Sequence, residues 1–177
     1  DEGSIDVSVS ASGKVVPAFE EIINSPINSR ILEVYKKGGD SVDIGTPILR
    51  LDLLSAENDY KKQLDEVQMN QLKLEQLRIQ NKSKLSEMEM QLKVSRMELS
   101  RKAVELKNEQ YLDSLGAGTT DKVRQVELDY NVSKLKLEED EQKYINEQAT
   151  ADADLKVKQL ELNIARKNLE ETKRTLD

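Results

Sequence analysis

Residues 112–120 read Leu112-Asp113-Ser114-Leu115-Gly116-Ala117-Gly118-Thr119-Thr120, and they hold the only two glycines that follow Ile48. The other five of the seven glycines and all three prolines precede Ile48. Because proline and glycine interrupt helices, this distribution predicts long helices on both sides of the quoted stretch. Gly116 suits the left-handed conformation that ends a helix, and Thr119 or Thr120 is expected to cap the next one.

The segments on either side of the turn are expected to be two helical arms, over 53–115 and 121–177, with a tip over 116–120. Both segments are rich in Leu, Lys, Glu and Gln, which are good helix formers. Asp52 or Ser55 is expected to cap the first arm. Each arm of roughly 60 residues would be about 90 Å long at 1.5 Å per residue.

Apolar residues repeat every seven positions along both arms, which is the pattern of a coiled coil. Folding the chain at 117–118 brings together residues that lie equally far from the turn, such as Leu99 and Leu137. The heptad line slips by four residues at the same height in both arms, which is a stutter that leaves the pairing intact. The sequence therefore predicts an antiparallel two-helix hairpin. Its seam is expected to contain Leu74, Leu92, Leu99, Leu106, Leu137, Tyr144 and Leu162.

A second apolar line lies two positions before the seam line, which places it about 160° away around each helix. Its members are Met90, Met97, Val104 and Tyr111 in the first arm, and Leu128 and Leu135 in the second. One interpretation is that this line contacts a neighbouring subunit. The alternative is that these are scattered exposed apolar residues, which are ordinary on protein surfaces.

The first 52 residues are expected to form short β-strands. Ile5, Val7, Val9 and Ala11 alternate with polar residues, as in a half-buried strand. Short β-branched runs follow, separated by glycine and proline turns. A β part of about 40 residues is marginally stable alone, so it is expected to lean on another element.

The composition excludes several function classes. The chain has no Cys, no His and a net charge of −7. A Cys or His nucleophile, a His base and a Cys/His zinc site are therefore impossible, and the basic excess typical of nucleic-acid binders is missing. The pairs Asp40/Asp43 and Asp152/Asp154 lack the rest of a calcium loop. We expect no enzymatic activity, no metal, no cofactor and no nucleic-acid partner.

Four stretches of the β part resemble the first half of a biotinyl/lipoyl-like domain. They are Ser12–Pro17 (SGKVVP), Ser25–Ile31 (SPINSRI), Gly39–Val42 (GDSV) and Gly45–Asp52 (GTPILRLD). A long helical hairpin directly after such a half-motif is similar to the membrane fusion proteins of the haemolysin-secretion-D-like type. These are the periplasmic adaptors of bacterial efflux pumps and type I secretion systems.

The resemblance implies an architecture in which the hairpin is inserted between two half-motifs that pair into one flattened β-sandwich. Residues 13–52 would be the first half-motif, and residues 1–12 a strand arriving from a β-barrel or membrane-proximal region. The returning half-motif would follow residue 177. The fold class expected is mainly α with a small β part.

The resemblance also implies a function in transmembrane transport across the cell envelope. The protein would lie in the periplasm, anchored to the inner membrane by a segment outside this chain. Its partners would be an inner-membrane transporter, an outer-membrane channel and further copies of itself in a trimeric or hexameric ring.

In tripartite pumps the hairpin tip of the adaptor meets the channel. The family tip pattern has an Arg before a Leu, further leucines, and a Ser after a Gly-Ala-like turn. The expected docking residues here are Leu112, Leu115, Gly116, Ala117, Gly118 and Thr119, with Thr119 standing in for the Ser. The Arg is missing, and Gln110 and Tyr111 occupy that neighbourhood.

Two other functions remain as alternatives. A carrier domain of a biotin- or lipoate-dependent enzyme presents a modifiable Lys at the turn between half-motifs, but here Leu51-Asp52 continues into the first arm without one. A plain coiled-coil tether is the other alternative, and the glycine-punctuated β part argues against it.

Overall fold

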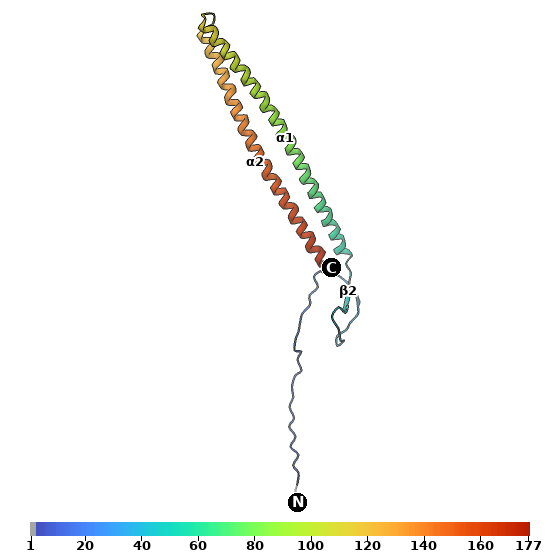
Figure 1. The fold of residues 1–177 in the computed structure, drawn as a ribbon. Coiled ribbons are helices and arrows are strands. Elements are labelled where there is room, and N and C mark those ends of the chain that lie inside the picture. The colour runs from blue at the N-terminus through green and yellow to red at the C-terminus, as the bar shows by residue number, and fades with distance from the viewer. Residues whose placement is uncertain (1–2) are drawn as a thin grey trace. The chain divides into compact units, whose positions relative to one another are not determined.

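The computed structural model describes residues 3–177 and is mainly helical, with a small two-stranded antiparallel sheet (Figure 1). This confirms the expected fold class at the coarse level of a mainly α chain with a small β part. The chain divides into two compact units, Asp1–Asp52 and Leu53–Asp177. The two units are described separately below.

The first unit contains strands β1 (Ile31–Val34) and β2 (Leu49–Leu51), which pair antiparallel with Ile31 opposite Leu51. Two further bonds extend the pairing at its ends, because Tyr35 N donates to Ile48 O at 2.7 Å and Asp52 N donates to Arg30 O at 2.7 Å. The connection between the strands turns at two glycines with positive φ, Gly39 and Gly45. This short two-stranded ladder is the only sheet within the described residues 3–177.

The strand expected from 5 to 11 is absent, and residues 3–30 contain no strand. Ile5, Val7 and Val9 are 81–89% exposed, although they alternate with polar residues as predicted. A strand forms only where its N–H and C=O groups have a partner strand, and alternation alone does not supply one. The short apolar runs at 15–16 and 22–23 form no strand and are exposed for the same reason.

The second unit consists of helices α1 (Leu54–Ser114) and α2 (Thr120–Leu176), 61 and 57 residues long. Their bounds differ by a single residue from the expected arms. Leu53 holds the N-cap position of α1 and its own side chain makes no capping bond, so the helix begins between the two expected cap residues, Asp52 and Ser55. A helix of this length is stabilised by packing along its side far more than by one cap.

The two helices lie side by side and run in opposite directions (Figure 1). Polar contacts join them at three heights: Thr172 Oγ1 donates to Gln63 Oε1 at 2.8 Å, Asn81 Nδ2 to Ala151 O at 3.4 Å, and Ser95 Oγ to Asp140 Oδ2 at 3.5 Å. The first and last pairs are equally far from 117–118 to within one residue, which fixes the register of the helix pair.

Buried residues form a single line between the helices. Leu74 and Leu162 lie at the same height and are 7% and 2% exposed. The other seam residues Leu99, Leu106 and Tyr144 are half-buried. The full set of buried side chains in the described residues is Leu74, Leu92, Val126, Leu137, Ala151 and Leu162.

The spacing of the less exposed positions breaks at one height in both helices. Steps of three and four residues alternate along α1 except at 77–81–85, where two steps of four follow each other. The same double step occurs in α2 at 147–151–155. Asn81 and Ala151 are the central residues of the two breaks, and they are joined by the hydrogen bond described above. The phase slip is thus shared by both helices.

Charged and polar contacts border the seam. Glu147 Oε1 lies 2.7 Å from Lys84 Nζ on the other helix. Arg96 Nη2 lies 3.5 Å from Glu141 Oε1, and the neighbouring Ser95 contacts Asp140.

We expect Leu74→Ala to lower the free energy of unfolding by about 2–5 kcal/mol, because it removes a buried side chain and leaves a cavity against Leu162. Leu72→Ala is the matched control, since Leu72 is 64% exposed on the same helix. That change should stay within about 0.5 kcal/mol of the parent protein. Urea unfolding followed by circular dichroism in dilute solution measures both; equal losses would show that the seam is misplaced.

Candidate docking site at the turn between the helices

The turn between α1 and α2 is held by one carbonyl. Leu112 O accepts bonds from Leu115 N at 3.2 Å, Ala117 N at 3.0 Å and Gly118 N at 3.2 Å. Gly116 adopts φ +75, the left-handed conformation that ends a helix. Gly116 N donates to Asp113 O at 3.0 Å, so the N–H groups of residues 115–118 all have an acceptor and the reversal is compact.

The two glycines of the turn are required for different reasons. Gly116 has open space around it, so its positive φ alone disfavours a side chain. A Cβ at Gly118 would lie 3.1 Å from Asp113 N and 3.3 Å from the carbonyl carbon of Leu112. Backbone atoms move less easily than flexible side chains, so Gly118 is needed for the close approach of the turn to the end of α1.

Thr119 caps the second helix. It has extended backbone, φ −123 and ψ 146, and its Oγ1 accepts a bond from Lys122 N at 3.2 Å. Asp121 lies in the first turn of α2, where a negative charge is favourable. Thr119 therefore has a structural role, whatever else it contacts.

The turn also presents apolar side chains to solvent. Leu112 is 40% exposed, Leu115 is 62% exposed and Tyr111 is 65% exposed. Tyr111 was expected to belong to the second apolar line and to stand near the place where the adaptors have an Arg, and it was not among the expected docking residues. Its exposure next to two leucines adds it to the apolar surface of the tip.

The predicted tip residues gather at this one reversal. Leu112, Leu115 and Ala117 lie on its exposed surface, and the two glycines and Thr119 shape its backbone. The predicted seam residues lie elsewhere, along the facing sides of α1 and α2. Asn81 stands where the heptad line of α1 resumes after its phase slip. The other cross-helix partners Gln63 and Ser95 were not among the expected seam residues, because polar residues carry no signal in a search for apolar heptads.

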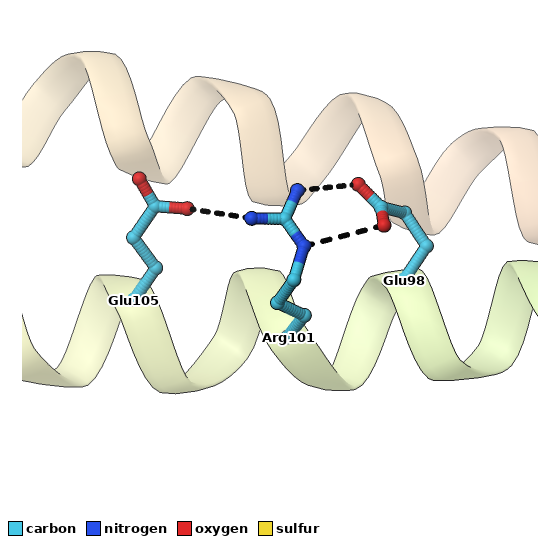
Figure 2. A network of polar contacts seen from close by, with 3 residues as sticks. All are labelled: Glu98, Arg101 and Glu105. Atoms are coloured by element: carbon cyan, nitrogen blue, oxygen red, sulfur yellow. Dashed lines mark hydrogen bonds and ion pairs between the residues drawn. The ribbon is translucent and has the colours of Figure 1, made fainter.

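An exposed charge network lies on α1 below the turn. Arg101 donates to both carboxylate oxygens of Glu98, at 2.7 and 3.3 Å, and lies 3.8 Å from Glu105 (Figure 2). The hydrogen bond from Arg101 lowers the pKa of Glu98. A lowered carboxyl pKa gives stability that is lost as the pH falls through it, and at this exposed site the contribution is small.

Glu139 and Lys143 form the corresponding pair on α2, at 2.9 Å and in the expected i,i+4 order. The hydrogen bond from Lys143 lowers the pKa of Glu139, and the same bond raises the pKa of Lys143. Glu98 pairs with Arg101, three residues later, and not with a lysine. The planar guanidinium can bind both oxygens of one carboxylate, which an ammonium cannot.

Within residues 3–177 no group of His, Cys, Asp and Glu side chains is arranged to hold a metal ion. No helix in that range combines the length and apolar character needed to cross a bilayer. Comparison with protein families, with curated protein sequences and with solved structures returned no match. The proposals below therefore rest on the residues of this chain.

We expect Thr119→Ala to lower the stability of the helix pair by about 1 kcal/mol, because Lys122 N loses its capping acceptor. Thr119→Ser keeps a hydroxyl at the same place and should retain most of that stability. Thermal unfolding of the two variants beside the parent protein measures the difference. If both serine and alanine variants unfold like the parent, the cap contributes nothing and Thr119 is free to serve another role.

Proposed function

We propose that this chain is part of a periplasmic adaptor that links an inner-membrane transporter to an outer-membrane channel, in an efflux pump or a type I secretion system. The observation that carries the proposal is the pairing of two helices of 61 and 57 residues that end in an apolar turn. Such a pair is about 90 Å long, so its tip can contact a partner far from its base.

The shape of the helix unit supports a linking role over an enzymatic one. Its interior is one line of buried side chains without a buried polar or charged residue. Catalytic groups usually lie in concave pockets with perturbed pKa values, and the shifted groups of the helix unit, Glu98, Arg101, Glu139 and Lys143, are exposed surface pairs. A long helix pair with an exposed apolar turn is suited to connecting two partner proteins.

The first unit supports the lipoyl-like half-motif as part of the proposal. A groove of about 700 Å³ is lined by the segment 23–29 and by residues of the two strands, and its lining combines apolar side chains with those of Asn, Ser and Thr. Ile23, Ile31 and Leu49 line it and are 41–80% exposed. In the proposed architecture the second half-motif packs into this groove and completes the sandwich. A half-sandwich that leaves its apolar groove open needs such a cover to be stable.

The tip is the proposed contact with the outer-membrane channel. Leu112 and Leu115 supply its apolar surface, while Gly116, Gly118 and Thr119 hold the backbone that presents them. The absence of the family Arg leaves apolar contact as the main source of affinity. The protein would act in the periplasm, as part of a ring of adaptor copies anchored to the inner membrane.

The leucines of the tip give the test of this function. Deleting the gene should abolish export of the substrate of the pump or secretion system, and the unchanged gene should restore it. Leu112→Ser combined with Leu115→Ser should not restore export, because it removes the apolar contact with the channel. Thr119 stays unchanged in this design, since altering it would also remove the cap of α2.

Leu64→Ser is the matched control, because Leu64 is 46% exposed on α1 far from the turn. It should restore export fully. Circular dichroism and immunoblotting should show that all variants are folded and present at equal levels. Full export with both tip leucines replaced would contradict a docking role for the tip.

A further inference from the structure

The outer faces of the two helices carry apolar lines that continue through the phase break. On α1, Leu72 and Ile79 stand two positions before Leu74 and Asn81, just as Met97 stands two before Leu99. On α2, Leu160 stands two positions before Leu162. The members that are large and apolar are 59–71% exposed, and they are Leu72, Ile79, Met90, Met97, Val104 and Tyr111 on α1 and Leu128, Leu135 and Leu160 on α2.

Single exposed apolar residues need no explanation, but this arrangement does. Solvent-exposed helix faces have no reason to keep a seven-residue repeat. They have even less reason to shift phase where the buried seam shifts, as Ile79 does beside Asn81. A line that follows the seam through its stutter stays on one side of the helix pair, opposite the partner helix. Such a continuous side is what a second helix requires.

The heights of the two outer lines are complementary. Measured by distance from the turn at 117–118, Leu128 lies between Tyr111 and Val104, and Leu135 lies between Val104 and Met97. Leu160 in the same way lies between Ile79 and Leu72. The alternation in steps of three and four residues is that of knobs and holes in one coiled-coil interface.

The charges beside the two lines are also complementary. Lys93 and Lys107 follow the α1 line residues Met90 and Val104 by three positions, so they border that line. Glu138 borders the α2 line in the same way, three positions after Leu135. Opposite charges across such an interface favour this pairing over that of two identical faces.

We infer that a second copy of this chain packs with the outer line of its α2 against the outer line of α1, at the same height and with both turns pointing the same way. The inference rests on the self-association proposed above and names the surface that makes it. Only copies at equal height bring the alternating residues together. A head-to-tail contact without axial shift is also the kind that closes into a ring.

Four single-cysteine variants test the mode of packing, because the chain has no native cysteine. They are Val104→Cys and Ile79→Cys on α1, and Leu135→Cys and Leu160→Cys on α2. Each α1 variant is mixed with each α2 variant, one of them carrying a tag that separates mixed from identical dimers by mass. Mild oxidation then reports which cysteines meet.

The two height-matched mixtures, 104 with 135 and 79 with 160, should give several-fold more mixed disulfide than the two swapped mixtures. In the matched mixtures the positions differ by about four residues in height, or about 6 Å, whereas in the swapped ones they differ by more than about 30 Å. The same four variants occur in both sets, so any effect of a substitution on folding cancels. Circular dichroism confirms that each variant is helical.

Light scattering of the parent chain at the same concentrations separates the possible failures. If oligomers form but disulfides between identical variants dominate, this packing mode is wrong and self-association still holds. The same conclusion follows if oligomers form and the swapped mixtures react as well as the matched ones. An absence of oligomers at the highest soluble concentration, together with no disulfide above that of the urea-unfolded chain, overturns both.

Discussion

Burial of one narrow line of side chains between α1 and α2 is the interaction on which the rest of this structure depends. A helix of about 60 residues with a third of its residues charged has little stability alone, because each helix is mostly solvent-exposed. Pairing removes Leu74, Leu92, Leu137 and Leu162 from water. The turn at 116–119 makes that pairing intramolecular, so its cost in loop closure is small. Length, register and the position of the tip all follow from it.

The seam is mostly apolar but includes polar residues at three heights. Gln63 with Thr172 and Ser95 with Asp140 form polar pairs, and Asn81 donates to the backbone carbonyl of Ala151. Gln63, Asn81 and Ser95 stand where a stronger coiled coil would have leucine or isoleucine. Polar pairs in a seam reduce stability and restrict which partners fit. The large apolar residues of the helix pair are therefore divided between the seam and the outer faces.

The sequence predicts the helical unit well and the β unit poorly, for a physical reason. Helix ends and the turn follow from local signals, such as Gly116 and Thr119, and the phase break was visible in the leucine spacing. Strand pairing depends on a partner that can be far away, so alternation from Ile5 to Val9 predicted a strand that does not form. The polar pairs Gln63–Thr172 and Ser95–Asp140 were not predicted, because only their geometry, and no pattern of residue types, identifies them.

Photo-crosslinking from the tip in intact cells tests the central claim most directly. A photoreactive phenylalanine analogue at Leu115 samples what touches the end of the helix pair, and the same analogue at Leu64 samples the shaft. The adaptor account predicts an adduct with an outer-membrane channel protein from position 115 and none with that protein from position 64. If position 115 gives no outer-membrane partner, or if both positions give the same partners, the helix pair does not connect the channel through its tip.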